Sequence, residues 1–323
     1  MANYLVTGIA GFIGSRVGET LLSQGHNVVG VDNLNDYYDV RLKEHRLSRF
    51  SEQAGFEFCN VDIESREGLK TVFERHKVDA VLNLAARAGV RYSMENPHVY
   101  LSTNAAGTLN LLDEMVRSGV RKMVLASTSS LYAGQEMPFV ENLPVNTPIS
   151  PYAASKKAAE VMAYSYHNLY GLDISVVRYF TVFGPCGRPD MSIFRFIKWI
   201  DEGEEIELFG DGEQSRDFTY VEDVAEGTIA ALREVGYEII NIGGGKNPIS
   251  LNKIIGWLEE QIGKKAKIRR EAFHKADIVS TWADISKAKR LLDWEPEISV
   301  EEGIRRTVDW HLQNREWLKN ISL

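Results

Sequence analysis

The sequence predicts an α/β fold in which a doubly wound parallel sheet is followed by a smaller C-terminal α/β domain. Over the first 180 residues, short β-branched or apolar runs alternate with longer helical patterns, which is typical of consecutive βαβ units. The first run leads directly into a glycine-rich turn that opens a helix, at residues 7–14. All six tryptophans lie between residues 199 and 317, where the alternation becomes less regular.

The apolar runs that we expect to form strands share β-branched residues and short length. They are Tyr4–Thr7, Val28–Val31, Phe56–Asn60, Ala80–Asn83, Lys122–Ala126 and Ile174–Arg178. The helical patterns that separate them lie near residues 12–24, 65–76, 98–118 and 152–170. Further helical patterns occur near residues 190–203, 250–263 and 300–319.

The change in composition indicates two domains. The stretch after residue 217 contains a helix and a further strand, Glu238–Ile242, and we assign it to the first domain. The first domain is therefore expected to comprise residues 1–180 and 217–248. Residues 181–216 and 249–323 are expected to form the smaller domain, which would bind the substrate.

Composition limits the possible partners and the compartment. The 323 residues carry a formal charge of −8, whereas a nucleic-acid partner calls for a basic surface. Cys59 and Cys186 are the only cysteines, and the seven histidines show no ligand spacing, so we expect neither a disulfide nor a metal site. The uncharged stretch Met1–Ser15 lacks a basic leader and is shorter than the roughly 18 residues of a membrane span. We expect a cytoplasmic protein without a membrane partner.

The glycine-rich turn has the spacing GxxGxxG. Gly8, Gly11 and Gly14 let the backbone turn sharply and approach a diphosphate, and the following helix offers unpaired N–H groups. Asp32 follows the second expected strand, 18 residues after Gly14, close to the ~20 typical of an acid that binds the adenosine ribose. Because a carboxylate repels a 2′-phosphate, this pattern favours NAD over NADP. Alternatively, Asp32 is only a turn residue before Asn33.

A tyrosine and a lysine indicate a catalytic centre. Tyr152 and Lys156 stand four residues apart on an expected helix, and hence on one face. A free tyrosine has a pKa near 10, and a cation within ~4–6 Å lowers it by about 1–3 units. The hydroxyl-bearing run Ser127–Ser130 follows an expected strand and would face the same crevice. Each pattern alone also fits an ordinary surface helix or a helix cap, but their combination behind the glycine-rich turn favours catalysis.

Together, these motifs resemble the extended short-chain dehydrogenase/reductase superfamily, and within it the NAD-dependent sugar-nucleotide epimerases and dehydratases. The resemblance covers essentially the whole chain and implies that the first domain is of the Rossmann type. It implies that Tyr152 is the catalytic base, that Lys156 orients it and holds the nicotinamide ribose, and that Thr128 assists at the reacting hydroxyl. The segments 216–223 and 282–284 match the same group.

Longer strings are similar to UDP-glucuronate 4-epimerases. They are DNLNDYYD at 32–39, AGVRYS at 88–93, FTVFGP at 180–185 and GRPDM at 187–191. The cofactor-binding residues that the resemblance implies are Gly8, Gly11, Phe12, Ile13, Gly14, Asp32, Asn33, Asn35, Asp62, Ile63, Leu84, Ala85, Ala86, Asn104, Ser127, Tyr152, Lys156 and Tyr179. The implied substrate-binding residues are Arg91, Thr128, Ser129, Ser130, Thr181, Arg188, Phe209, Arg216 and Asp277.

Within the substrate set, the resemblance implies separate roles. The hydroxyls of Thr128, Ser129, Ser130 and Thr181 would surround the sugar carboxylate. Arg188 and Arg216 would meet the sugar diphosphate, and Asp277 would lie near the uridine ribose.

The sequence also departs from this pattern. Ala133 stands where a glycine usually follows the preceding tyrosine, and Arg87 stands where glutamine is usual. Residues 209–212 resemble the superfamily at large more than the subgroup. Because this segment borders the uracil in relatives, base specificity is the least determined property.

The resemblance implies that Tyr152 removes the 4-hydroxyl proton while hydride passes from C4 to NAD, and that the 4-keto sugar then turns and is reduced on its other face. Related decarboxylases carry glutamate at the position of Ser130, and 4,6-dehydratases carry Asp-Glu at Ser129 and Ser130. Epimerisation of UDP-glucuronate at C4 is therefore the leading interpretation. The alternatives are a UDP-glucuronate decarboxylase, a 4-epimerase of a neutral UDP-sugar and a non-catalytic NAD-binding scaffold. Relatives further suggest a homodimer formed through the helices at 98–118 and 152–170.

Overall fold

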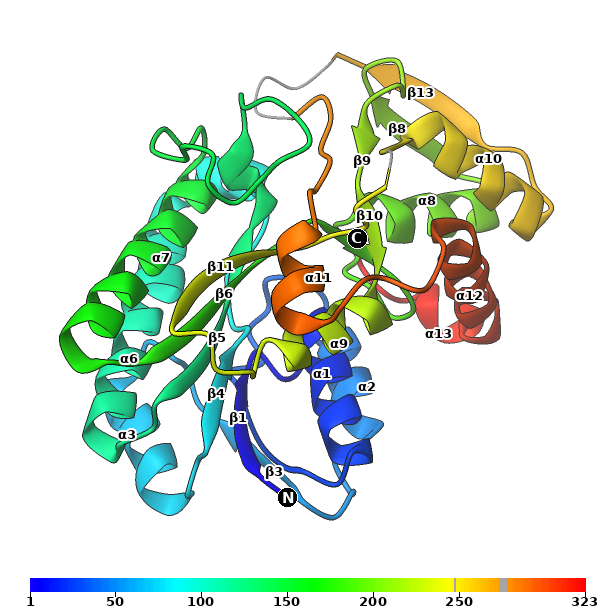
Figure 1. Cartoon of the computed structure of the whole chain (residues 1–323). Helices are drawn as coiled ribbons and strands as arrows, with labels where there is room; N and C mark the ends of the chain where they lie inside the picture. Colours follow the sequence, from blue (N-terminus) through cyan, green and yellow to red (C-terminus); the bar gives the residue numbers. More distant parts are fainter. Residues whose placement is uncertain (247, 273–277) are drawn as a thin grey trace.

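The fold is organised around one parallel sheet. The structure is a computed structural model, and it describes residues 1–246, 248–272 and 278–323. In these residues seven strands form the sheet in the order β11-β6-β5-β4-β1-β2-β3, all parallel (Figure 1). Because the chain winds outward in both directions from β1 and β4, a crevice opens at the carboxyl ends of these strands, where such sheets bind ligands.

The strands agree closely with the expected runs. They are β1 (Asn3–Thr7), β2 (Asn27–Asp32), β3 (Phe56–Asn60), β4 (Ala80–Asn83), β5 (Lys122–Thr128), β6 (Asp173–Tyr179) and β11 (Tyr237–Ile242). All residues of β4 and β5 are buried, as expected for parallel strands that are covered on both faces. Apolar runs bounded by turns were therefore a sufficient signal for these strands.

Helices cover both faces of the sheet. One face is covered by α3 (Arg66–Arg75), α6 (Gly107–Ser118) and α7 (Pro151–Tyr170), and the other by α1 (Phe12–Ser23), α9 (Val221–Ala230) and α11 (Ser286–Leu292) (Figure 1). Leu111 and Ala163 belong to the core on the first face, and Val17 and Val224 to the core on the second. In the described residues no helix has both the length and the apolar character that crossing a membrane requires.

Shorter helical segments lie beside the crevice. They are α2 (Val40–Ser48), α4 (Val90–Glu95), α5 (Pro97–Tyr100), the π-helical segment η1 (Leu101–Ala106) and the 3₁₀ turn η2 (Ser129–Tyr132). The helix α2 was not expected, because its sequence is dominated by charged residues. It begins after Asp39, whose side chain accepts from the Arg41 backbone N–H at 3.1 Å, and it buries Lys43 and Arg46 together with Leu42.

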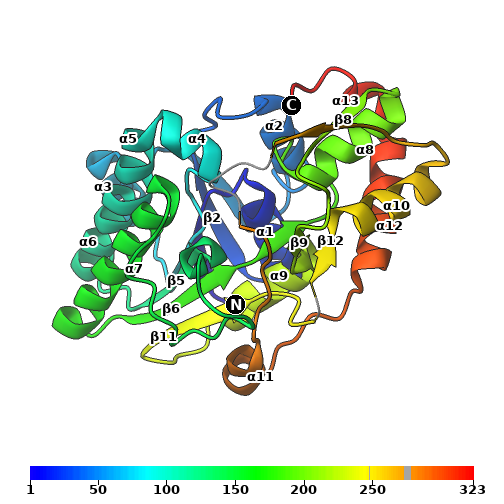
Figure 2. The same cartoon turned by 90° about the horizontal axis from the view of Figure 1, so that it is seen from above.

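The remaining elements gather beyond the sheet. They are β7 (Thr181–Phe183), α8 (Ser192–Glu202), β8 (Glu205–Phe209), β9 (Ser215–Arg216), β10 (Phe218–Tyr220), β12 (Ile249–Ser250), α10 (Leu251–Ile262), β13 (Lys267–Glu271), α12 (Val300–Gln313) and α13 (Arg315–Leu318). Figure 2 shows α8, α10, α12 and α13 grouped on the side of the molecule opposite α6 and α7. They share an apolar core that includes Ile197, Leu258 and Ile304.

The chain returns to the sheet after residue 217. β11 pairs with β6 from Tyr237 to Ile242, and α9 lies against α1. Arg46 also connects the two parts of the molecule, since its guanidinium donates to Cys186 O at 2.9 Å and to Ala10 O at 3.2 Å. This buried contact joins the loop after β7 to the glycine-rich turn.

Candidate active site

A large cleft opens at the carboxyl ends of the central strands. It spans about 1580 Å³, part of which is open to solvent, and is lined by most of the residues that the sequence analysis selected. These are Gly8, Gly11, Phe12, Ile13, Gly14, Leu84, Ala86, Ser127, Thr128, Ser129, Ser130, Tyr152, Lys156, Tyr179, Thr181, Arg188 and Arg216. The cleft therefore brings the glycine-rich turn, the hydroxyl run and the tyrosine–lysine pair together.

A second pocket of about 590 Å³ adjoins the first at the glycine-rich turn. It is lined by the remaining residues expected near the adenosine, which are Asp32, Asn33, Asn35, Asp62, Ile63 and Ala85. Gly8 and Gly11 line both pockets. The two pockets thus form a continuous surface for an extended ligand.

The glycine-rich turn fits a dinucleotide diphosphate. Gly8 has φ +69°, and a Cβ there would lie 2.7 Å from the Ala85 nitrogen; a Cβ at Gly11 would lie 2.9 Å from the Gly8 oxygen. Side chains at these positions would displace the backbone. No side chain caps the N-terminus of α1, so its first N–H groups face the pocket with the positive end of the helix dipole.

The acid at the end of β2 is held in place by the backbone. Asp32 is 8% exposed, and its carboxylate accepts from Leu34 N at 2.9 Å and from Ala10 N at 3.1 Å. Beside it, Asn33 donates to the Asp62 carboxylate at 2.6 Å. These acceptors line the pocket where a ribose would lie, and the arrangement fits the hydroxyls of an adenosine ribose.

The catalytic pair lies at the start of α7. Ser150 accepts from Ala153 N at 3.2 Å and Pro151 is the first helical residue, so the sequence fixes where this helix begins. One helical turn separates Tyr152 from Lys156, and both side chains reach the cleft. The Lys156 ammonium, which is buried, donates to Ala126 O on β5 at 2.9 Å.

The ionisation of the two groups depends on their surroundings. Burial raises the pKa of Tyr152, whereas a hydrogen bond with Thr128 and the charge of Arg188 lower it. Burial lowers the pKa of Lys156 to about 8, against the opposing charge of Glu160. The sequence attributed the tuning of the phenol to Lys156, which stays a prediction; in this structure Thr128 and Arg188 also favour the phenolate.

Two tyrosines that the sequence analysis did not select, Tyr37 and Tyr100, meet Arg188 at one backbone carbonyl. Ala88 O accepts from Tyr37 OH at 2.5 Å, from Tyr100 OH at 3.2 Å and from an Arg188 nitrogen at 3.4 Å. The Tyr100 ring lies edge-on to the Tyr152 ring, with centroids 6.0 Å apart. The string at 88–93 marked this segment, but spacing alone gave no sign of the contacts.

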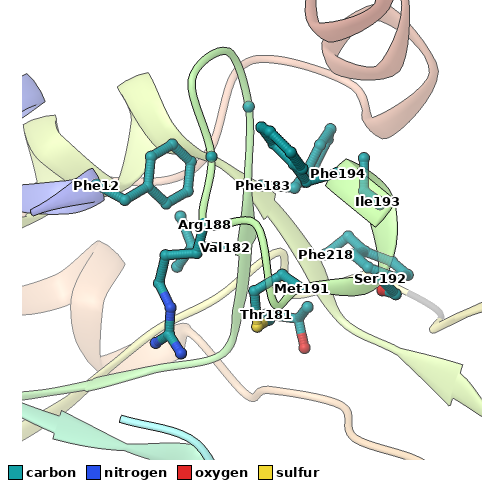
Figure 3. A pocket seen from close by; sticks show the side chains of 12 residues that line it. Phe12, Thr181, Val182, Phe183, Arg188, Met191, Ser192, Ile193, Phe194 and Phe218 are labelled. Carbon is teal, nitrogen blue, oxygen red and sulfur yellow. The ribbon is translucent and has the colours of Figure 1, made fainter. Parts of the chain in front are cut away.

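The substrate side of the cleft combines hydroxyls with arginines. Arg188 forms an ion pair with Asp190 at 2.5 Å, and Arg216 donates to Ser215 O at 2.8 Å. Next to the cleft lies a pocket of about 300 Å³, in which Phe12 and Thr181 are among the lining residues. Figure 3 shows the Arg188 guanidinium pointing away from the phenylalanine rings at the far side of this pocket.

Some expected site residues lie elsewhere. Arg91 and Phe209 line neither pocket and contact each other, with the guanidinium carbon 4.0 Å from the ring centroid. Asn104 anchors the loop after β4, because its side chain binds both backbone groups of Arg87, at 2.8 and 2.9 Å. Asp277 lies outside the described residues.

Two basic residues of the adenosine pocket were also missed. Lys43 donates to Asn35 O at 2.7 Å, and Arg87 donates to the Asn35 side chain at 3.0 Å. Both line the pocket that contains Asp32. Arg87 could have been found from its departure from the usual glutamine, whereas Lys43 reaches the pocket only because α2 packs beside it.

Folding brings His76 beside two potential metal ligands of β3, Glu57 and Cys59. Atoms of Glu57, Cys59 and His76 lie within 4.8 Å of one another at the outer strand β3. His76 Nε2 lies 3.5 Å from a Glu57 carboxylate oxygen and 3.9 Å from Cys59 Sγ. None of these residues lines either of the two pockets described above.

Asp217 gives the site a pH-dependent contribution to stability. Its buried carboxylate accepts from Gly244 N at 2.5 Å, from Gly245 N at 3.2 Å and from Ala283 N at 2.8 Å, and thereby joins three loops. Burial raises the pKa of Asp217 to about 6, although these backbone donors oppose the rise. The Asp217 carboxyl therefore binds its proton more tightly in the folded chain than in the unfolded chain.

We expect the Asp217→Asn variant to lose this pH dependence. In the parent, the carboxyl should lower the free energy of unfolding by about 2 kcal/mol as the pH rises from 4 to 6, and by about 3 kcal/mol over its whole titration. In the variant this contribution is absent, so the curve should be flatter over that interval. Urea denaturation at several pH values measures the free energy of unfolding of both proteins. If the two curves of free energy against pH were parallel, Asp217 would not be the source of the pH dependence.

The comparison with known proteins agrees with this geometry. Residues 4–243 match the NAD dependent epimerase/dehydratase family. The chain belongs to this family. This epimerase/dehydratase family member is 64% identical, over 323 residues, to a UDP-glucuronate 4-epimerase of Thermodesulfobacterium geofontis (strain OPF15), with 100% of both chains covered.

Solved structures of relatives have the same fold. One is a UDP-glucuronic acid 4-epimerase from Bacillus cereus in complex with UDP-glucuronic acid and NAD; it has a TM-score of 0.91 and 36% identity and covers 96% of this chain and 99% of its own. Another is a UDP-glucose 4-epimerase from Thermotoga maritima with UDP-glucose, with a TM-score of 0.87, 33% identity and coverage of 97% and 99%. The Rossmann-type architecture expected from the sequence is confirmed.

Proposed function

We propose that the chain is an NAD-dependent 4-epimerase that interconverts UDP-glucuronate and UDP-galacturonate. The observation that carries this proposal is the cleft itself, where Tyr152 and Lys156 face the hydroxyls of Thr128, Ser129 and Ser130. The relative that is 64% identical over the whole chain carries the same activity in its name. The glycine-rich turn and Asp32 supply the features that NAD requires.

The chain's own residues would position the sugar and move one proton. Bound NAD would supply the hydride acceptor and donor for C4 of the sugar. Tyr152 would take the proton of the 4-hydroxyl and return it after the keto sugar has turned, assisted by the Thr128 hydroxyl. Arg188 and Arg216 would hold the diphosphate while the sugar rotates.

The hydroxyl run supports epimerisation over decarboxylation. A 4-keto uronate is a β-keto acid, and it loses CO₂ when the carboxylate aligns with the carbonyl π system. Hydrogen bonds from Ser129, Ser130 and Thr181 would hold the carboxylate out of that alignment, at about 1.5–3 kcal/mol for each bond to the charged group. Neither Ser129 nor Ser130 is replaced by the acid that the decarboxylases or dehydratases carry.

The test is one incubation of the NAD-loaded protein with UDP-glucuronate and, in parallel, with UDP-glucose. We expect UDP-galacturonate to form from the first and little UDP-galactose to form from the second, as followed by NMR. Release of CO₂ with formation of a UDP-pentose would identify a decarboxylase instead. Turnover of UDP-glucose alone would identify a 4-epimerase of neutral sugars, and tight NAD binding without turnover would identify a scaffold.

Removal of two hydroxyls should change the product. In the Ser129→Ala/Ser130→Ala double variant, we expect CO₂ to appear alongside UDP-galacturonate, because the carboxylate is less restrained. Two lost bonds at about 1.5–3 kcal/mol each correspond to a rise of roughly 100-fold or more in decarboxylation relative to epimerisation. Ser102→Ala, in a residue outside the cleft, is the control. A double variant that releases no more CO₂ than the parent would contradict the role of these hydroxyls.

We also propose a homodimer that forms through α7 and the neighbouring η1. On α7, Val161 and Tyr164 are 53% and 55% exposed, and Leu101 on η1 is 58% exposed. Large apolar side chains at helical spacing favour a helix-to-helix interface. Sedimentation should show a dimer for the parent and a monomer for Val161→Asp, and a monomeric parent would overturn the proposal.

The remaining assignments follow the sequence analysis. We propose a cytoplasmic location, consistent with Cys59 and Cys186 being free thiols. We also propose that residues 1–180 and 217–248 form the cofactor domain, since β11 extends the sheet next to β6. Residues 181–216 and 249–323 would form the domain that binds the nucleotide sugar.

A further inference from the structure

A buried ion pair lies directly behind the catalytic residues. Arg178 on β6 donates to the two carboxylate oxygens of Glu160 on α7, at 2.9 and 2.8 Å. Both side chains are 1% exposed, and neither lines the cleft. Ser127 on β5 donates its hydroxyl to the same carboxylate at 2.7 Å. The carboxylate is thus fixed from two strands.

The position of this carboxylate relates it to catalysis. Glu160 follows Lys156 by one helical turn on α7, and residues at this spacing lie on one face of a helix. Ser127, which also binds Glu160, immediately precedes Thr128. A buried ion pair contributes little net stability compared with an apolar pair of the same size. Its place behind the lysine therefore points to a role in the site.

Glu160 is charged at neutral pH and acts on the lysine. Burial by itself would raise the pKa of Glu160, but Arg178 and Ser127 bring the pKa below its ordinary value. The charge of Glu160 in turn opposes the fall that burial causes in the pKa of Lys156. Among the described residues, the other charged or titratable groups that face Glu160 are Lys157 on α7, Tyr132 in η2 and Tyr237 on β11.

We propose that Glu160 is a positioning residue for Lys156: its carboxylate, held by Arg178 and Ser127, keeps the lysine ammonium charged and directed into the cleft. Arg178 limits this effect, because its own charge neutralises part of the carboxylate. The inference rests on the proposed function for the catalytic role of Lys156. The charge interaction between Glu160 and Lys156 does not depend on which substrate the cleft binds.

Two substitutions that break the same ion pair should act in opposite directions. Glu160→Gln removes the negative charge, so Lys156 should lose its proton at a lower pH. The alkaline limb of the pH profile of kcat, where kcat falls as the pH rises, should therefore move down by about one pH unit. Arg178→Gln leaves the carboxylate without its cationic partner, so the alkaline limb should move up. Glu160→Asp retains the charge and should keep the limb close to its parental position.

A second readout does not depend on turnover. In the NAD-loaded protein with ¹³C-labelled lysine, the Cε resonance of Lys156 reports its titration directly, and Lys156→Met identifies the peak. We expect the midpoint to fall in Glu160→Gln and to rise in Arg178→Gln. Thermal unfolding of each variant shows whether the fold is retained.

The outcomes separate this inference from the proposed function. If both variants move the limb and the Lys156 midpoint in the same direction, or leave them unchanged, the ion pair is only structural and the inference is overturned. If Arg178→Gln does not fold, the comparison of Glu160→Gln with Glu160→Asp decides. If no UDP-sugar is converted, the proposed function fails, and the resonance of Lys156 still tests the inference.

Discussion

Replacement of Tyr152 by phenylalanine should reduce conversion of UDP-glucuronate by about 10³-fold or more, since general acid–base groups contribute roughly 10²–10⁴-fold. The phenol is the group in the cleft placed to exchange a proton with the sugar, beside Thr128 and at the start of α7. The ring itself would remain packed against Tyr100. NAD affinity should therefore change only a few-fold. Initial rates by NMR and NAD titration measure the two effects.

The matched control is Tyr170→Phe at the other end of α7. Tyr170 is 53% exposed and its ring contacts Tyr166, a contact that phenylalanine preserves. This variant should have the rate of the parent. A Tyr152→Phe protein that converts its sugar nucleotide as fast as the parent would overturn the proposed function.

The second large effect is expected for Gly8→Ala, which should abolish measurable NAD binding. An added Cβ would lie 2.7 Å from the Ala85 nitrogen, and both residues belong to backbone segments that cannot move independently of β1 and β4. The positive φ of +69° adds roughly 1–2 kcal/mol of strain for any other residue. We therefore expect NAD affinity to fall by at least 100-fold and the melting temperature to fall as well.

Gly25→Ala separates strain from steric conflict. Gly25 has a similar φ of +80°, but a Cβ there would meet nothing within 4 Å. This variant should incur only the backbone strain of the positive φ, without a steric clash, and it should bind NAD as the parent does. If Gly8→Ala binds NAD as well as Gly25→Ala does, the close approach at the turn is not what forms the cofactor site.

Much of the fold was predictable because its signals are local. Each strand of the main sheet was marked by a short apolar run, since the central strands are covered on both faces and are rich in apolar residues. The helix expected at residues 152–170 is α7, which begins one residue earlier, at Pro151, after the cap Ser150. By contrast, α2 was missed because it buries the polar side chains of Lys43 and Arg46. Apolar periodicity does not report such a helix.

The site was predictable to the extent that spacing fixes geometry. Tyr152 and Lys156 share a helix face. Gly8 and Gly11 follow β1 and Asp32 ends β2, and the carboxyl ends of these parallel strands meet. Arg91 and Phe209 were assigned to the substrate by resemblance. In the structure they contact each other and line neither pocket, and their assignment stays a prediction.

By itself, the sequence determined the strand and helix order, the glycine-rich turn and the family of the chain, because these depend on residues close together along the chain. Only the tertiary structure decided that Ala88 O accepts hydrogen bonds from Tyr37 and Arg188. The same holds for the ion pair of Glu160 with Arg178 behind Lys156. These contacts join different strands, helices and loops, and their energies depend on burial that exists only after packing. Local spacing carries no information about them.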